Sequence, residues 1–562
     1  MFERASPDGA GGTAGRVGVV LGSQDATPLE FWVGAEEGQT VELDDLVVCA
    51  ARAPDGETVR FYGVVDVVRK RYEGAQFDGD AFRVEAGMLP AEVSYAAHVH
   101  VTRIDPERFL PPHPGAPVRI AAGPDLEHAL YFDRMPARLP IGLTRGGDPL
   151  YANLEFLDGT RGAHASISGV SGVATKTTYA MFLLYALFHS GVLAADAANT
   201  RAVVINVKGE DLLWLDHPNA KLSATDRALY EAIGLPVAPF QDVGIYAPAR
   251  PGSAAVVPHT GSRHVGVRPY LWTLREFARD RLLPFCFAEA DDARSQIGYA
   301  VERVTGYLAD LAQRGSADDP GLDGGGRPLR TLDDVAQHLE QSGQLGELIS
   351  SPPTREAFLR RLHAACARMG HLVRGTEAPD RWAIRWDRHR VTVVDIHTLH
   401  SVGQMFVVGV LLKRMMAHKE QQGSARPLVF VVLDELNKYA PREGWSPIKD
   451  VVLDIAERGR SLGISLFGAQ QTASEVAPRV QANAALKVVG RLDAAEAEHS
   501  EYGFLTPVAR RRAAFLQPGA MIVTQPEIPS PLLVRFPFPA WATRVSEVPA
   551  GTAAGRDPFA RF

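Results

Sequence analysis

Residues 167–179 read ISGVSGVATKTTY and lie between a short apolar run and a long helical one. A phosphate-binding loop has the spacing G-x-x-x-x-G-K-[ST] between a strand and a helix. Counted back from Lys176, the two glycine positions hold Val170 and Thr175, and counted forward from Gly169 the lysine arrives one residue late. The stretch is therefore either a nucleotide site with a widened loop or a plain strand–helix turn.

The flanking segments favour the nucleotide site. ASISGV before the loop is strand-like, and TTYAMFLLYALFHSG after it predicts a helix that ends at Gly191. Glycines let backbone N–H groups approach phosphate oxygens, and a helix amino terminus adds a favourable field. We expect Lys176 to reach the β- and γ-phosphates of ATP and Thr177 to bind Mg²⁺. The expected ATP-binding residues are Gly169, Ser171, Gly172, Val173, Ala174, Thr175, Lys176, Thr177 and Thr178.

Six short runs predict the strands of one sheet. Most are apolar almost throughout, which is typical of parallel strands buried on both faces and covered by helices. The fold class expected for this part is α/β. The runs are residues 164–170, 201–209, 390–397, 427–435, 463–470 and 485–493.

Other parts of the chain have different sequence patterns. Short Val-, Phe- and Tyr-rich runs, including FRVEAGML at 82–89, predict an all-β barrel or sandwich before the sheet. A helical insertion interrupts the sheet, with Thr331 and Asp334 as a capping box and Gly343 as a stop. The expected units are a disordered start at 1–14, the barrel at 15–135, the core at 136–270, the insertion at 271–388, the second part of the core at 389–545 and a loose tail at 546–562.

Two carboxylates follow the apolar run LVFVVL. Asp434 and Glu435 stand at the carboxyl end of an expected parallel strand, where ligands bind in such sheets. We expect Asp434 to hold the Mg²⁺ shell and Glu435 to polarise the water that attacks the γ-phosphate. An ordinary helix-start pair is the alternative.

Further along, Gln470 ends the next strand, where it can sense the γ-phosphate or the attacking water. Arg458 and Arg460 lie on a helix edge, and an arginine offered to a neighbouring subunit's phosphate accelerates hydrolysis by about 10³–10⁵. Solvated surface arginines are the alternative. Lys208 and Glu210 follow the second strand, either near the nucleotide or near a channel.

Composition excludes several classes. The 562 residues are 46 % apolar and 22 % charged, as in an ordinary globular protein, and the net charge of −7 argues against a generally basic nucleic-acid binder. Three widely spaced cysteines and a start without a signal peptide predict a reduced, cytoplasmic protein. The longest apolar run, 179–188, is too short to cross a membrane, and we expect no membrane contact. Zinc-site and G-x-S-x-G spacings are missing.

The order of these motifs resembles the HerA-type ATPases, which are hexameric ring motors related to the DNA translocase FtsK. The resemblance covers about residues 15–545 and is most specific in VVLDELNKYAP, IAERGRSLGIS and FGAQQTASEV. It implies a RecA-like P-loop core and an amino-terminal barrel of the HAS type that docks partners. It also implies that PSPLLVRFPFPAWATR, residues 529–544, is a strap lying along the adjacent subunit.

Carried over to this chain, the resemblance implies a catalytic set. Lys176 and Thr177 are then the Walker A residues, and Asp434 and Glu435 the Walker B pair. Arg460 becomes the finger that acts in a neighbouring subunit, with Arg458 in reserve, and Gln470 the sensor. The family usually has Gly directly before the lysine, where this chain has Thr175, so we expect this difference to affect the rate of hydrolysis more than the fold.

Two functions follow from the resemblance. The first is a homo-hexameric DNA translocase or helicase that hydrolyses ATP at subunit interfaces, passes double-stranded DNA through its pore and works with a partner nuclease. The second is a ring-shaped scaffold of a bacterial anti-phage defence complex that assembles a nuclease or sirtuin-like NADase effector on the barrel. The acidic net charge and the altered loop favour the scaffold somewhat over a fast motor.

Overall fold

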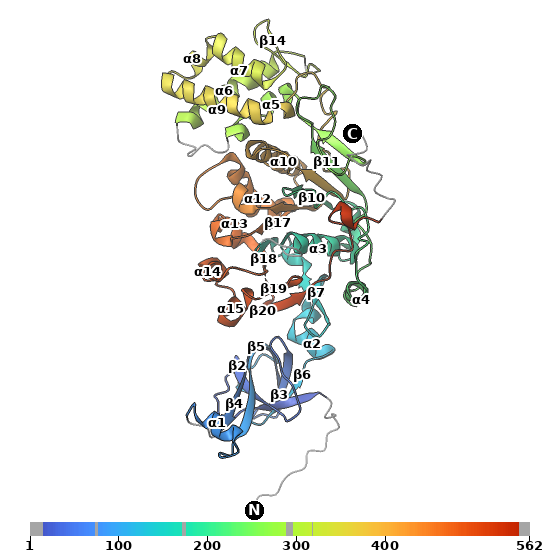
Figure 1. Cartoon of the computed structure of the whole chain (residues 1–562), viewed down its shortest axis with the longest axis vertical. Helices are drawn as coiled ribbons and strands as arrows, with labels where there is room; N and C mark the ends of the chain where they lie inside the picture. The colour runs from blue at the N-terminus through green and yellow to red at the C-terminus, as the bar shows by residue number, and fades with distance from the viewer. Residues whose placement is uncertain (1–14, 74–76, 171–175, 288–295, 317, 550–562) are drawn as a thin grey trace, which may run out of the picture.

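A computed structural model gives the fold of the chain, and it describes residues 15–73, 77–170, 176–287, 296–316 and 318–549. Figure 1 shows a barrel at one end, a large sheet in the middle and a group of helices at the other end. The expected fold class is confirmed, an α/β core preceded by a separate all-β unit. The unit boundaries given above remain predictions.

The amino-terminal unit is a closed antiparallel barrel whose strand order, within the described ranges, is β1-β2-β5-β4-β3-β6. Its interior is filled by alternate residues such as Phe31, Val33, Phe61 and Val99. Such alternation is what half-buried strands require. The elements are β1 (Arg16–Val20), β2 (Glu30–Ala35), β3 (Leu46–Arg52), β4 (Thr58–Glu73), α1 (Asp80–Glu85), β5 (Glu92–Asp105), β6 (Pro117–Ile120), α2 (Pro124–Ala129) and the 3₁₀ turn η1 (Phe132–Arg134).

One expected strand of the barrel is wrong. Residues 82–89 lie in helix α1 and the turn after it, and Gly87 at φ +70° lets the chain turn back so that Met88 N–H and Leu89 N–H donate to Arg83 O. A short alternating run fits a strand or a helix equally well in sequence, and here Phe82 and Met88 are 74 % and 73 % exposed. Because no strand in the described part of the chain pairs with this run, nothing stabilises its extended form.

The central sheet runs in the order β12-β11-β15-β10-β16-β17-β9-β18-β19-β20-β7-β8 through the described residues. From β12 to β18 all neighbours are parallel, as the continuous apolar runs predicted, and the rest are antiparallel. The parallel strands are β9 (Ala163–Ser168), β10 (Arg201–Asn206), β11 (Val243–Pro248), β12 (Val267–Tyr270), β15 (Val391–Asp395), β16 (Val429–Asp434), β17 (Ile464–Gln470) and β18 (Ala484–Val489). The antiparallel extension, which the sequence analysis did not predict, contains β7 (Arg138–Leu143), β8 (Pro149–Asn153), β19 (Ala520–Gln525) and β20 (Ile528–Arg535).

Helices cover both faces of the parallel strands. Ala202 and Val204 of β10 face α3, whereas Val203 and Ile205 face the side covered by α10, α12 and the insertion. Helix α3 is buried nearly all round, which explains its uninterrupted apolar sequence. The core helices are α3 (Lys176–His189), α4 (Ala224–Ile233), α10 (Ser401–Gln422), α11 (Leu436–Tyr439), α12 (Pro447–Leu462), α13 (Pro478–Asn483), α14 (Ala494–Ala497) and α15 (Pro507–Ala513).

The insertion is mainly helical, as expected, and packs at the far end of the sheet from the barrel (Figure 1). It contains α5 (Leu274–Arg279), α6 (Gln296–Gln313), the hairpin β13 (Leu322–Asp323) and β14 (Pro328–Leu329), α7 (Leu332–Gln341), α8 (Gln344–Leu348) and α9 (Pro352–Met369). The insertion also contains the 3₁₀ turns η4 (Leu283–Phe287) and η5 (Gly370–Leu372), and further 3₁₀ turns elsewhere are η2 (Leu154–Phe156), η3 (Ala194–Ala198), η6 (Ala473–Glu475), η7 (Ser500–Tyr502) and η8 (Val545–Glu547). No helix in the described part of the chain combines the length and apolarity that a membrane crossing requires.

The capping box of α7 forms as the sequence predicted. Asp334 N–H donates to Thr331 Oγ1 at 3.1 Å, and Thr331 N–H donates to Asp334 Oδ2 at 2.9 Å. Removing such a cap costs about 1 kcal/mol of helix stability.

We therefore expect Thr331→Ala to open α7 more often than in the parent protein. Amide hydrogen exchange in this helix should become about fivefold faster, the factor that corresponds to about 1 kcal/mol of local opening free energy. Thr331→Ser keeps a hydroxyl acceptor and serves as the control. Unchanged exchange in Thr331→Ala would show that packing of α7, and not its cap, limits opening.

Candidate functional site

The functional side chains converge because of the strand order. Strand β9 leads to Lys176 and Thr177 at the start of α3, β16 ends in Asp434, and β17 lies between β9 and β16. The three strands are parallel, with Gln470 opposite Ser168 and Asp434 opposite Ala469, so their carboxyl ends share one edge. This is the edge at which ligands bind in open α/β sheets.

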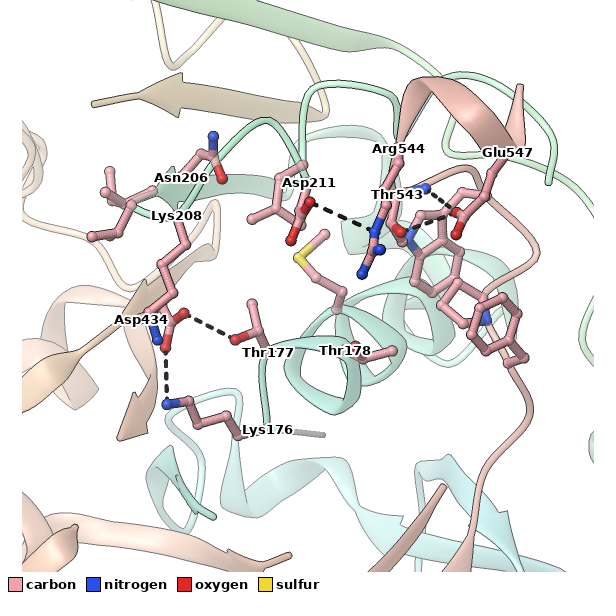
Figure 2. A pocket seen from close by; sticks show the side chains of 17 residues that line it. Lys176, Thr177, Thr178, Asn206, Lys208, Asp211, Asp434, Thr543, Arg544 and Glu547 are labelled. Atoms are coloured by element: carbon pink, nitrogen blue, oxygen red, sulfur yellow. Dashed lines mark hydrogen bonds and ion pairs between the residues drawn. The ribbon is translucent and has the colours of Figure 1, made fainter. Parts of the chain in front are cut away.

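Lys176 contacts both carboxylates and Thr177 contacts Asp434; Figure 2 shows the contacts of the two residues with Asp434. Lys176 Nζ lies 3.8 Å from Asp434 Oδ1 and 3.4 Å from Glu435 Oε1, and Thr177 Oγ1 donates to Asp434 Oδ2 at 3.0 Å. The Lys176 side chain is 2 % exposed, and its burial lowers the pKa of the ammonium group even though both carboxylates oppose that shift. The structure thus brings these four side chains together, and their roles at a nucleotide remain predictions.

Glu435 occupies a strained position. Its backbone is left-handed, with φ 57° and ψ 46°, a conformation that costs free energy for a residue other than glycine and that concentrates at functional sites. Burial opposes ionisation of the side chain, but hydrogen bonds from Lys208 and Gln471 and the charge of Lys176 outweigh it and lower the pKa to about 2. Glu435 is thus a buried carboxylate held in its charged form.

The loop before α3 is described only in part. Gly169 N–H donates to Gln470 O, and Val170 N–H donates to Arg491 O. Because both amide hydrogens are used in hydrogen bonds to neighbouring backbone, they do not donate to a phosphate in this structure. Ser171, Gly172, Val173, Ala174 and Thr175 lie outside the described residues. Thr178, by contrast, lines the cavity beside Thr177.

The two glutamines at the end of β17 point to different places. Gln470 is fully buried, and its amide donates to Ser166 Oγ and Ser168 Oγ, both at 2.8 Å, on strand β9. Gln471 Nε2 instead donates to Glu435 Oε1 at 3.1 Å. The structure therefore brings Gln471, and not the expected Gln470, to Glu435, and the role of Gln470 as a sensor remains a prediction.

Neither candidate arginine contacts this cluster. Arg460 is exposed, and its guanidinium donates to Gly159 O at 3.0 Å and Thr160 O at 2.8 Å. Arg458, on the same helix, pairs with Asp454 at 3.0 Å and with Glu420 at 2.5 Å. Both side chains lie on the surface of the chain.

A cavity of about 360 Å³ opens beside Lys176 and Thr177. Its walls are the start of α3, the loop after β10 and the carboxyl-terminal segment 538–547, and Arg544 Nε lies 3.9 Å from Asp211 Oδ1 across it (Figure 2). Sequence reasoning missed Asp211, Arg544 and Gln471 because loop residues acquire a common location only after folding. Lys208 and Glu210 had been placed near the nucleotide or a channel, and the structure puts Lys208 on the cavity wall.

The carboxyl-terminal segment packs on its own chain. Residues 528–535 form strand β20, and Phe536 and Trp541 enter an aromatic cluster with Tyr179 and Tyr185 of α3. Phe536, Ala540 and Trp541 belong to the core of the same chain, and the expected strap along an adjacent subunit remains a prediction. Glu547, within the expected tail, is also buried and accepts hydrogen bonds from Thr543.

The donor set suits a magnesium nucleotide. Mg²⁺ takes oxygen ligands, commonly one or two from the protein, with the rest from phosphates and water. Thr177 Oγ1 and the Asp434 carboxylate are adjacent oxygens of this kind, and a buried ammonium group stands beside them. In the described part of the chain no cluster of three or more His, Cys, Asp or Glu side chains could hold a metal by itself.

Strand order and this grouping of lysine, threonine and two carboxylates define an α/β core of the P-loop ATPase fold, preceded by a closed β-barrel. No protein-family description matches the chain, and no curated protein matches its sequence.

Several solved structures are similar to it at low identity. VirB4 of Thermoanaerobacter pseudethanolicus has 13 % identity and a TM-score of 0.43, with 71 % of this chain and 96 % of that one covered. The plasmid coupling protein TrwB in complex with ADP and Mg²⁺ has 11 % identity and a TM-score of 0.45, with 73 % and 92 % covered. These low values leave the function to be inferred from the chain's own geometry.

Proposed function

We propose that the protein is an ATPase of the HerA type that assembles into a homo-hexameric ring and moves double-stranded DNA through its centre. One observation carries this proposal: Lys176, Thr177, Asp434 and Glu435 meet at the carboxyl edge of a parallel sheet. The substrate is ATP with Mg²⁺. TrwB, which the chain resembles in fold, has been solved with ADP and Mg²⁺, in line with this choice.

Each residue of the site has a chemical task in this proposal. Lys176 neutralises charge on the phosphates, and its burial strengthens that interaction. Thr177 and Asp434 hold Mg²⁺, which when bound supplies a Lewis acid at the phosphate oxygens. Glu435 accepts the proton of the attacking water, because its carboxylate stands beside Lys176, which holds the phosphates that the water attacks.

The ring completes the site in this proposal. The seam between subunits places Arg460 of one subunit at the ATP held by its neighbour, with Arg458 as the reserve. Support comes from the exposed position of both arginines and from the hydrogen bonds of Arg460 to Gly159 O and Thr160 O, which precede strand β9, whereas Lys176 follows that strand. Interfaces that repeat head to tail close into rings of this kind.

The alternative is a scaffold of an anti-phage defence complex, in which the ring assembles a nuclease or NADase effector on the barrel. A specific observation favours it. Phe77, Phe82 and Met88 at the β4–β5 connection of the barrel are each more than 70 % exposed, and exposed apolar groups often mark protein contacts. Under this alternative, ATP binding stabilises the ring and the effector does the chemistry.

DNA dependence separates the two functions. A motor should hydrolyse ATP several-fold faster with double-stranded DNA, and its DNA binding should weaken steeply between 50 and 200 mM salt, as phosphate contacts do. Native mass measurement with and without ATP tests the ring. A rate indifferent to DNA would support the scaffold, and a monomer at all nucleotide concentrations would exclude both.

A further inference from the structure

Two lysines meet one carboxylate oxygen in the site. Lys176 Nζ lies 3.4 Å from Glu435 Oε1, and Lys208 Nζ forms an ion pair with the same oxygen. Lys208 stands on the loop that follows β10 and lines the cavity, as Figure 2 shows. Lys176 stands at the start of helix α3 and Lys208 on the loop after β10, so the two ammonium groups approach Glu435 from different elements.

The two lysines differ in freedom. The Lys176 side chain is 2 % exposed, whereas that of Lys208 is 46 % exposed. A lysine on a flexible four-carbon stem at a cavity wall can change partner at little cost. Lys208 is therefore the more accessible cation of the pair.

The shared oxygen has more donors than it can satisfy well. Besides the two lysines, Gln471 Nε2 donates to Glu435 Oε1 at 3.1 Å. A carboxylate oxygen offers about two lone-pair directions. One of the three donors is thus replaceable, and a ligand with greater negative charge than one carboxylate would attract the exposed one.

We propose that Lys208 is a positioning residue for Glu435 and that it distinguishes nucleoside triphosphates from diphosphates. This inference rests on the proposed ATPase function. Without a terminal phosphate, Lys208 pairs with Glu435 and occupies the oxygen that would accept a proton from water. When a γ-phosphate enters the cavity, Lys208 pairs with that group, and Glu435 Oε1 becomes available to the attacking water.

The test compares two affinities in the full-length protein. We expect Lys208→Ala to weaken binding of a fluorescent non-hydrolysable ATP analogue about tenfold or more, because one charged hydrogen bond is lost. Binding of the matching ADP derivative should change less than about twofold, since ADP has no group for Lys208 to read. Lys208→Arg should keep part of the preference for the triphosphate. Lys438→Ala, an exposed lysine just after Glu435, is the matched control.

A role limited to structure would move both affinities together. An equal loss for the two nucleotides, or no loss for either, overturns the inference. Should Lys208→Ala fold poorly, Lys208→Met keeps the aliphatic stem without the charge. It is judged by the same ratio of the affinity for the ATP analogue to the affinity for the ADP derivative. Failure of the parent protein to bind either nucleotide would overturn the proposed function and this inference together, and that result differs visibly from an altered ratio.

Discussion

Glu435→Gln should lower ATP hydrolysis by about 10²–10⁴-fold, the usual contribution of a general base. Glutamine has nearly the same volume and can occupy the same buried position, but its amide does not accept the proton of the attacking water. Binding of ATP should persist, because Lys176, Thr177 and Asp434 are intact, and removal of a negative charge beside the phosphates does not oppose it. Steady-state phosphate release and nucleotide binding, measured on the same preparations, check both parts.

The control for this substitution is Glu443→Gln, which changes an exposed carboxylate a few residues further along the chain. It should hydrolyse ATP at the parent rate. If Glu435→Gln also hydrolyses within twofold of the parent, Glu435 is not the base. In that case the site either binds nucleotide without hydrolysing it or takes the proton elsewhere.

Much of the core could be predicted because burial leaves a strong trace in sequence. Strands buried on both faces must be apolar throughout, so runs such as LVFVVL before Asp434 identified the parallel sheet. Parallel strands present their carboxyl ends at one edge, which is why Lys176 and Asp434 could be expected to meet across 258 positions of sequence. In both cases the sequence pattern follows from a physical requirement of the fold, so the pattern predicts where the residues lie.

The remaining features depend on which segments pair and which way a side chain points, and the sequence does not show either directly. The sheet is extended by the antiparallel strands β7, β8, β19 and β20. Their short runs become recognisable as strands only when the strands with which they pair are known. Adjacent residues near a strand end point to opposite sides, so one position decides whether Gln470 or Gln471 reaches Glu435. Run 82–89 alternates like a strand, yet no strand of the described residues pairs with it, and it forms the end of α1 and the turn that follows.

Loss of Arg460 should have the largest effect on catalysis if the ring forms as proposed. A guanidinium supplied from a neighbouring subunit stabilises transition-state charge and is worth about 10³–10⁵ in rate. We therefore expect Arg460→Ala to reduce hydrolysis by that factor, while ATP binding to Lys176 and Thr177 stays within a few-fold. Arg458→Ala should cost much less, since its side chain pairs with Asp454 and Glu420 on the surface.

Arg460 also donates to Gly159 O and Thr160 O within its own chain, so a lower rate alone would not distinguish catalysis from local structure. An experiment with mixed subunits distinguishes a catalytic role of Arg460 from a structural one. Rings formed from Arg460→Ala and Glu435→Gln subunits contain seams in which an intact Glu435 faces an intact Arg460, and these seams should recover activity that neither variant has alone. A local structural defect in Arg460→Ala would not be repaired by a neighbour. If mixed rings stay inactive while Arg458→Ala loses 10³-fold or more, Arg458 is the residue that crosses the seam.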